Sequence, residues 1–342
     1  MTVQYLHEIS RGFEGGELEG GPEQLGPSRL RWARSVFVIV NPAAAGGEVG
    51  DTWGEISLLL NGVVGPYAWS MTQGPGDATE LTRQALRAGF EVIASLGGDG
   101  THNEVINGFF ERGRPVREGA ALALLPYGTG GDLRKTLNLS GDLREASERL
   151  TEGRVGPCDV GHLEFIDDDG LVQARHFINI ASFGLGGLVD RKVNASSKAL
   201  GGRLSFMLGT LRAFAEYVPP RVRLVIDDGR VDVDVQINSV AVANGRYFGG
   251  GMKIAPNARI DDGLFDVIIT RHGGLPKLVE SAIKVYDGRH FESGAVSHLQ
   301  ARRVYAEPVV PGTEVLLDVD GEAPGRLPAS FEVMPGAVQI VR

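Results

Sequence analysis

The first half of the chain alternates short apolar runs with amphipathic stretches. The run Ser35-Val36-Phe37-Val38-Ile39-Val40 ends at Asn41-Pro42, which predicts a buried strand that leads into a loop. Further along, the pattern predicts helices near 51–61, 77–89 and 101–112, and strands near 66–71, 91–96 and 121–125. Such alternation is typical of a parallel sheet covered by helices on both faces. Ligands bind such sheets at the carboxyl ends of the strands.

The second half has a different pattern. Residues 222–226 and 231–237 alternate apolar and polar side chains around the turn Asp227-Asp228-Gly229-Arg230, which predicts a β-hairpin. Further strands are predicted near 264–270, 302–306, 313–319 and 330–341. We therefore predict a flexible extension over 1–33, a Rossmann-like α/β nucleotide-binding domain over 34–155 and a β-rich, sandwich-like domain over 156–342. The segment near 325–342 is expected to pack back on the first domain.

Composition narrows the class of protein. The single cysteine, Cys158, excludes an internal disulfide and a thiolate zinc site. The chain has no run of about 18 apolar residues, so no membrane-spanning helix is predicted. The N-terminus lacks the pattern of a signal peptide. The formal net charge of −9 argues against nucleic-acid binding. These features favour a cytoplasmic protein.

Three glycine-rich loops carry the chemical signal. Gly97-Gly98-Asp99-Gly100-Thr101 follows a predicted strand and opens a predicted helix, where backbone amides can bind phosphate. Taken alone, this loop is more simply a strand–helix turn with Thr101 as its N-cap. The stretches 41–47 and 126–132 also follow predicted strands, so the three loops are expected to converge on one crevice. The chain has no GxxxxGK[ST] sequence, no protein-kinase motif set and no dinucleotide fingerprint.

The order and spacing of the motifs resemble the diacylglycerol kinase catalytic family, which includes sphingosine, ceramide and bacterial lipid kinases. The resemblance runs from about residue 35 to the C-terminus through NPAAAGG, TQGPGDATE, GGDGTHNEVINGF, LPYGTGGDL, INIASFGLGG, VANGRYFGGGMKIAPNARIDDGLFDV and DVDGEAPG. It implies that ATP binds in a cleft between an α/β domain and a β-rich, lipid-binding domain. The implied reaction is transfer of the γ-phosphate to the hydroxyl of a diacylglycerol-like or sphingoid lipid.

The resemblance also implies site residues. The implied nucleotide contacts are Asn41, Pro42, Ala43, Ala44, Ala45, Thr72, Gly98, Asp99, Gly100, Thr101, His102, Asn103, Glu104 and Thr129. In DVDGE, the family's general base matches Glu322, with Asp320 beside it. The loop at 261–264 matches a structural Mg²⁺ site, in which Asp262 offers its carboxylate and Arg259 and Leu264 offer backbone carbonyls.

Two positions depart from the family pattern. Gly131 stands where most members have Asn, and Ala45 stands where a glycine is common. Both changes bear on nucleotide affinity, and neither removes a carboxylate.

The chemistry requires a base, because a lipid alcohol is a poor nucleophile. Asp99 is the candidate that organises the catalytic Mg²⁺, and it could instead act as the base. The sequence does not decide among Asp99, Asp320 and Glu322.

The sequence gives weaker evidence for the region that contacts the lipid. Residues 186–223 hold seven basic side chains (Arg191, Lys192, Lys198, Arg203, Arg212, Arg221, Arg223) against Asp190 and Glu216. The segment is either a core helix with a solvated basic side or a helix that docks on an anionic membrane surface. A peripheral, transient membrane contact follows from the second interpretation, and a homodimer is also open.

Two other functions remain as alternatives at this point. One is an NAD kinase-like enzyme, against which the DVDGE and GRYFGGGMKIAP stretches argue. The other is a non-catalytic lipid or nucleotide sensor, against which the retained carboxylates Asp99, Asp320 and Glu322 argue.

Overall fold

The computed structural model describes residues 35–127, 131–188, 191, 217–274, 280, 281 and 283–342. Most of the basic segment 186–223 and the residue Thr129 therefore lie outside the described residues. The chain divides into two compact units. Of the described residues, the first unit holds those up to Tyr127, Leu139–Pro157 and Val338–Arg342, and the second holds those within 131–138 and 158–337.

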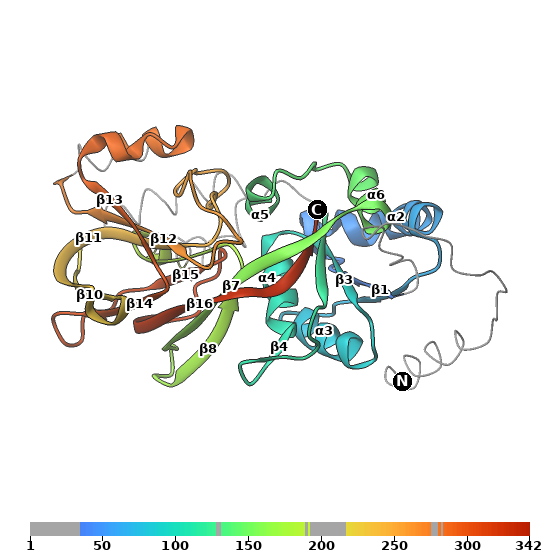
Figure 1. Cartoon of the computed structure of the whole chain (residues 1–342), viewed down its shortest axis with the longest axis horizontal. Coiled ribbons are helices and arrows are strands. Elements are labelled where there is room, and N and C mark those ends of the chain that lie inside the picture. Colours follow the sequence, from blue (N-terminus) through green and yellow to red (C-terminus); the bar gives the residue numbers. More distant parts are fainter. Residues whose placement is uncertain (1–34, 128–130, 189–190, 192–216, 275–279, 282) are drawn as a thin grey trace. The chain divides into compact units, whose positions relative to one another are not determined.

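The first unit is an α/β layer structure (Figure 1). Its elements are β1 (Val36–Val40), η2 (Ala44–Gly47), α2 (Glu48–Val64), β2 (Ala68–Met71), α3 (Asp77–Arg87), β3 (Val92–Gly97), α4 (Asp99–Gly108), β4 (Phe110–Glu111), β5 (Arg114–Pro115), β6 (Ala121–Pro126) and α6 (Leu143–Glu152). β2, β1, β3 and β6 pair in parallel in that order. The last residues of β16 (Arg326–Val341) add a further parallel strand beside β6.

Both faces of this sheet are buried. Val36, Val38 and Val40 pack with buried residues of α2 and α6, while Phe37 and Ile39 alternate with them and are buried on the other face. A strand buried on both sides needs apolar residues at every position, which explains the unbroken run from Val36 to Val40. The parallel sheet predicted for the N-terminal half is confirmed.

The second unit is β-rich. It holds α5 (Asp132–Thr136), most of β7 (Val155–Ile166), β8 (Val172–Phe177), β9 (Ile180–Gly184), β10 (Arg221–Ile226), η3 (Asp227–Gly229), β11 (Val231–Ala243), β12 (Phe265–Arg271), η4 (Val285–Asp287), η5 (His290–Ser293), β13 (Val296–Ala301), β14 (Arg303–Pro308), β15 (Leu317–Val319) and most of β16. The predicted hairpin is present as β10 and β11.

β11 takes part in two sheet regions. Its first residues pair with β10, and after a register shift between Ile237 and Ser239 the rest pairs with both β9 and β12. A shift of this kind bends the strand. The large buried side chains Phe177, Phe183, Phe265 and Phe331 pack within the resulting core. The β-rich C-terminal domain expected from the sequence is thereby confirmed.

Candidate active site

The turn at 97–101 lies at the carboxyl end of β3 in the first unit. The His102 amide donates to the Gly98 carbonyl at 3.1 Å, which starts α4 directly after the strand. A Cβ atom on Gly97 would lie 2.5 Å from Thr101 Oγ1, so the turn requires glycine there. Asn41 Nδ2 donates to Thr101 Oγ1 at 2.9 Å. The loops that follow β1 and β3 are therefore in contact, as their places after adjacent parallel strands predict.

Thr101, His102 and Asn103 have buried side chains, and Glu104 is partly buried. His102 Nδ1 lies 2.8 Å from Ser95 Oγ, and burial lowers the pKa of His102 to about 4 although the charge of Asp99 acts to raise it. His102 is therefore neutral at pH 7. Glu104 Oε2 accepts from the Ala78 amide at the start of α3, at 3.2 Å. These side chains hold the turn against its neighbours.

Residues 98–100 differ from residues 101–103, because all three are only partly buried. The amides of the first turn of α4 have no acceptor within the helix. This stretch combines such amides with the Asp99 carboxylate, and it can therefore present donors to an anion and an oxygen ligand to a cation.

The loop after β1 is ordered by its own side chain. Asn41 Oδ1 accepts from the Ala43 amide at 3.0 Å, and the Asn41 carbonyl accepts from the Ala44 amide at 3.1 Å. Ala45 has φ 54° and ψ 33°, a left-handed conformation that costs a non-glycine residue about 1–2 kcal/mol. This conformation explains why glycine suits the position better. The Thr72 amide donates to the Val40 carbonyl at 2.9 Å, so Thr72 lies at the same sheet edge.

The glycine-rich loop at 126–132 begins beside the turn at 97–101. The Tyr127 amide donates to the Gly97 carbonyl at 3.2 Å, and residues 128–130, with Thr129, lie outside the described residues. Gly131 has φ 83° and ψ 46°. Only glycine, and next to it asparagine or aspartate, readily adopts that conformation. Gly131 therefore meets the same backbone requirement as the Asn usual in the family.

The short helix α5 belongs to the second unit. Asp132 Oδ2 accepts from the Gly250 amide at 2.8 Å, and Thr136 Oγ1 accepts from the Arg246 amide at 2.9 Å. Lys135 Nζ lies 2.9 Å from Asp132 Oδ1. These contacts attach α5 to the loop after β11.

In the second unit, Asp320 and Gly321 form a tight turn. Their φ angles are 51° and 90°. Val319 and Glu322 exchange backbone hydrogen bonds of 2.8 and 3.1 Å across the turn. Positive φ at both central residues is typical of a two-residue type I′ turn, for which Asp-Gly is a favoured pair. Gly321 is further fixed because its amide donates to Asp318 Oδ1 at 2.9 Å.

The Asp320 carboxylate is fully engaged with the backbone. Asp320 Oδ1 accepts from the amides of Asn179 and Ile180 at 3.2 and 2.8 Å, and Oδ2 accepts from the Ile178 amide at 3.1 Å. Charge-assisted bonds of this kind are the strong ones. Asp320 therefore ties the turn to the start of β9.

Glu322 is placed differently, two residues later. Its side chain is 40% exposed, and its Oε2 accepts from Arg175 Nη2 on β8 at 2.5 Å. The carboxylate thus stands at the surface of a rigid turn with its orientation set by one arginine. Arg175 is not among the site residues expected from the sequence. Its partner lies 147 residues further along the chain, so no local pattern could reveal the pair.

The predicted Mg²⁺ loop forms a compact turn with an acidic surrounding. Asp262 Oδ1 accepts from the Leu264 amide at 3.1 Å, while Arg259 pairs with Asp261 at 3.4 Å. Asp159 receives the amides of Gly263 and Gly336, both at 2.7 Å. Burial raises the pKa of Asp159, and the neighbouring charge of Asp262 raises it further.

The comparisons with known proteins cover almost the whole described chain. The family model for the diacylglycerol kinase catalytic domain matches residues 35–163, and the model for the YegS C-terminal NAD kinase beta sandwich-like domain matches residues 179–342. A YegS-like lipid kinase of Chromohalobacter salexigens is 32% identical over 309 residues, which cover 84% of this chain and 92% of that protein. The chain belongs to the diacylglycerol kinase family of lipid kinases.

Other relatives of this lipid kinase support the same family assignment. A diacylglycerol kinase of Bacillus subtilis is 28% identical over 257 residues, 75% of this chain and 79% of that protein. A crystal structure described as a diacylglycerol kinase from Bacillus anthracis covers 90% of this chain and 96% of its own, with 26% identity and a TM-score of 0.69. The recognised family, the enzyme class and the fold class expected from the sequence are confirmed.

The two matched regions divide the candidate residues of this lipid kinase. Asn41 to Glu104 fall in the catalytic-domain match, and Arg259 to Glu322 fall in the C-terminal match. Among the described residues, no helix is both long and apolar enough to cross a bilayer. In the same part of the chain, no three His, Cys, Asp or Glu side chains gather as metal ligands, and the predicted Mg²⁺ loop uses only one carboxylate.

Proposed function

We propose that this lipid kinase transfers the γ-phosphate of ATP to the hydroxyl of a diacylglycerol-like or sphingoid lipid. Relatives that match most of the chain are named diacylglycerol kinases, which supports that substrate class. The observation that carries the proposal is the contrast between Asp320, whose carboxylate is engaged by three amides, and Glu322, whose carboxylate reaches the surface.

Glu322 is the general base in this proposal. It takes the proton from the lipid hydroxyl as that oxygen attacks the phosphate, and a well-placed base contributes about 10²–10⁴-fold to the rate. Arg175 orients the carboxylate, and Asp320 fixes the turn that carries it. A side chain whose oxygens already accept backbone amides is poorly suited to receive a proton, so Asp320 acts as a positioning residue.

The nucleotide contacts are proposed in the first unit, at Asn41 to Ala45, Thr72, Gly98 to Glu104 and Thr129. The amides at the N-terminus of α4 would donate to phosphate oxygens. Because the side chains of His102, Asn103 and Glu104 are buried or bonded within the unit, these residues would contribute through the turn that they hold. Asp99 would hold the catalytic Mg²⁺, which neutralises phosphate charge when bound.

A second Mg²⁺ is proposed at the loop of Arg259, Asp262 and Leu264. The residues fit such an ion, since a carboxylate and backbone carbonyls are hard oxygen donors. Burial raises the pKa of both Asp159 and Asp266, and the charge of Asp262 raises both further, so the surroundings hold negative charge that a cation would balance. This ion would stabilise the loop, with no part in the reaction.

The proposed location follows from the proposed substrate. A cytoplasmic enzyme acting on a bilayer lipid needs transient contact with the membrane surface, and we propose the basic segment 186–223 for that contact. Cosedimentation with anionic vesicles at low and high salt tests it, with the double variant Lys198→Glu, Arg203→Glu expected to sediment less. A homodimer is a further proposal, which sedimentation velocity tests.

The deciding assay offers radiolabelled ATP to the purified protein with a panel of acceptors: diacylglycerol, sphingosine and NAD. We expect label in the lipid phase with one of the two lipids and none in NAD. Labelled NAD with unlabelled lipids would contradict the proposal, as would binding of ATP with no transfer to any acceptor.

A further inference from the structure

Three exposed valines gather at one end of the β10–β14 pair in the second unit. β10 and β14 lie side by side and run antiparallel (Figure 1). The Val309 amide donates to the Arg221 carbonyl at 2.9 Å, so the two chains leave the sheet together. The exposed fractions of Val218, Val309 and Val310 are 82%, 37% and 59%. These three residues are called the valine tip below.

A tight turn presents Val310. The Thr313 amide donates to the Val310 carbonyl at 3.1 Å, across Pro311 and Gly312. Gly312 has φ 81°, and proline followed by glycine at the two central positions is typical of a type II turn. The proline ring also fixes one backbone angle of the turn. Val310 therefore stands at the surface on a backbone that has little freedom to lose on binding.

Val218 lies between two anchored neighbours. The Tyr217 hydroxyl donates to the Asn238 carbonyl at 2.6 Å, and the Pro219 carbonyl accepts from Gln236 Nε2 at 3.1 Å. The backbone is thus fixed on both sides of a residue that is almost fully exposed. Exposed apolar residues that gather in one place mark a site of interaction.

Two exposed arginines lie beside the valine tip. Arg221 follows Val218 by three residues and bonds to Val309 through the backbone. Arg271 lies opposite Ile237 across the β11–β12 pair, and the Ile237 amide donates to the Pro220 carbonyl at 3.0 Å. Neither arginine forms an ion pair with another described residue, so both charges are available to an anionic partner.

The acids on either side of Val309 and Val310 in the sequence are already paired. Glu307 accepts from Arg223 at 3.2 Å, and Glu314 accepts from Arg191 at 3.2 Å. The valine tip therefore combines apolar side chains with positive charge, although the whole chain has a formal net charge of −9. This combination matches an anionic bilayer, whose negative headgroups lie directly above its apolar acyl chains.

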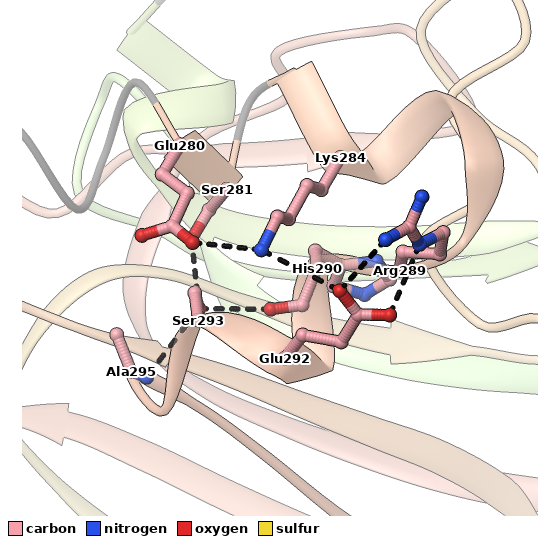
Figure 2. Close-up of polar contacts among 8 residues, drawn as sticks. All are labelled: Glu280, Ser281, Lys284, Arg289, His290, Glu292, Ser293 and Ala295. Atoms are coloured by element: carbon pink, nitrogen blue, oxygen red, sulfur yellow. Dashed lines mark hydrogen bonds and ion pairs between the residues drawn. The ribbon is translucent and has the colours of Figure 1, made fainter.

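A second exposed apolar residue of the same unit has different surroundings. Ile283 is 69% exposed. Figure 2 shows that the neighbouring Lys284 Nζ lies 2.7 Å from Glu280 and 3.5 Å from Glu292. Arg289 Nε donates to Glu292 Oε1 at 3.0 Å. Both cations drawn there are paired, so this surface offers an anionic bilayer much less attraction than the valine tip does.

A third exposed apolar surface lies on an acidic turn. Leu171 and Val172 are exposed at the turn between β7 and β8, directly after the three aspartates of 167–169 and Gly170. An anionic bilayer would repel this turn. Of the three surfaces, only the valine tip pairs exposed apolar side chains with available positive charge.

We propose that the valine tip inserts into the surface of an anionic bilayer, while Arg221 and Arg271 contact the lipid phosphates. A protein partner fits the tip less well. Stable protein interfaces cover about 800 Å² on each partner and are built around aromatic or arginine anchors in pockets, whereas three valines on a projecting turn cover a small part of that area. The proposal rests on the proposed function, because an enzyme whose substrate is a bilayer lipid must meet the bilayer.

Insertion is tested on the full chain with a fluorescent dye at the tip. Cys158 is the only cysteine of the chain and is buried, so the variant Val310→Cys can be labelled selectively with an environment-sensitive dye. Vesicles of equal parts phosphatidylglycerol and phosphatidylcholine should shift its emission to the blue, and spin labels in the acyl chains should quench it. The labelled variant Ile283→Cys is the matched control and should show neither change.

The double variant Val309→Ser, Val310→Ser tests how much the tip contributes. The exposed surface of the two residues is close to that of one whole valine, whose burial is worth about a factor of ten in partitioning. We therefore expect cosedimentation with the same vesicles to weaken about tenfold at low and at high salt alike, because salt screens charges and leaves apolar contacts intact. Ile283→Ser should sediment as the wild type does. Activity on a water-soluble, short-chain diacylglycerol should not change.

Three results would overturn the proposal. These are the absence of vesicle binding by the wild type, an unchanged emission of labelled Val310→Cys on bound vesicles, and unchanged cosedimentation of Val309→Ser, Val310→Ser. A dimer that this double variant converts into a monomer, with vesicle binding intact, would assign the tip to an interface between copies of the chain. Failure of the proposed function differs from all of these, since the wild type would then insert into the vesicles and phosphorylate no lipid.

Discussion

Two turns carry the candidate chemistry, and they are stabilised in opposite ways. The 97–101 turn of the first unit is held by neighbours in sequence and by the adjacent loop, through Gly98, Thr101 and Asn41. The 319–322 turn of the second unit is held by amides about 140 residues away, at Ile178, Asn179 and Ile180.

This contrast affects how the carboxylate of a glycine-containing motif is interpreted. Asp99 and Asp320 both sit in glycine-containing turns, yet Asp99 is partly exposed at a helix N-terminus while both oxygens of Asp320 are engaged by the backbone. Within the second turn, only Glu322 keeps an exposed carboxylate. We infer that, within the second turn, Asp320 has a structural role and Glu322 is the residue that takes part in the chemistry.

The largest expected effect is that of Glu322→Gln on turnover. Loss of the proton acceptor should lower kcat by about 10²–10⁴-fold. The unfolding free energy should change little, since an ion pair at the surface contributes at most about 1 kcal/mol. Steady-state kinetics and urea unfolding measure both quantities. Glu307→Gln, which removes a similarly exposed partner of Arg223, is the control and should keep full activity.

Asp320→Asn should mainly affect stability. The amide side chain keeps one acceptor and turns an NH₂ group toward a backbone amide, so the unfolding free energy should fall by about 2–3 kcal/mol. Asp228 offers a matched control, because it also has positive φ (57°) in a turn, but its carboxylate is exposed. Asp228→Asn should stay within about 0.5 kcal/mol of the wild type. Equal stability of the two variants would refute the structural role assigned to Asp320, which is to tie its turn to the start of β9.

Asp262→Ala should abolish stabilisation by Mg²⁺ without nucleotide. An ion that binds only the folded state stabilises it by about 2.7 kcal/mol at a hundred times its Kd. Thermal unfolding with and without Mg²⁺ measures this for the wild type and the variant, with Asp261→Ala as the neighbouring control. If the variant gains as much from Mg²⁺ as the wild type, the ion binds elsewhere.

Arg175→Met should reduce kcat through misorientation of Glu322. Loss of positioning costs up to about 10²-fold, and we expect roughly tenfold, with the Kd of ATP unchanged. Arg175→Lys should recover part of the rate, which a purely structural role would not predict. Arg303→Met removes an exposed arginine on β14 and serves as control. A raised Kd for ATP with normal kcat would contradict the positioning role.

The last substitution should slightly increase stability. Ala45→Gly relieves a left-handed alanine, so the unfolding free energy should rise by about 1 kcal/mol or less. Ala44 lies next to it in a conformation with negative φ, and Ala44→Gly should instead lower stability by about 0.5–1 kcal/mol. Two changes of the same sign would show that the backbone of this loop differs from the one described.

Local patterns predicted the elements of the first unit well. The expected helix at 77–89 is α3 at Asp77–Arg87, and the expected strand at 121–125 is β6 at Ala121–Pro126. The helix expected at 101–112 begins earlier, at Asp99, because the Gly98 carbonyl already accepts the first helical hydrogen bond. Periodicity indicates where a helix lies but not which residue starts it.

Long-range contacts could not be predicted in the same way. Nothing in residues 130–138 signals that α5 packs in the second unit, because its partners Arg246 and Gly250 lie more than a hundred residues away. The pairing of Arg175 with Glu322 and the amides that engage Asp320 are hidden for the same reason.

The most direct test of the division between the two acids is a phosphoryl-transfer rate. It is measured at saturating ATP and lipid for Glu322→Gln and Asp320→Asn, at a temperature where circular dichroism shows both variants folded. We expect Glu322→Gln to lose at least about a hundredfold in rate, while Asp320→Asn, once folded, retains much more of it. A folded Glu322→Gln protein that turns over like the wild type, beside an inactive Asp320→Asn, would contradict this expectation.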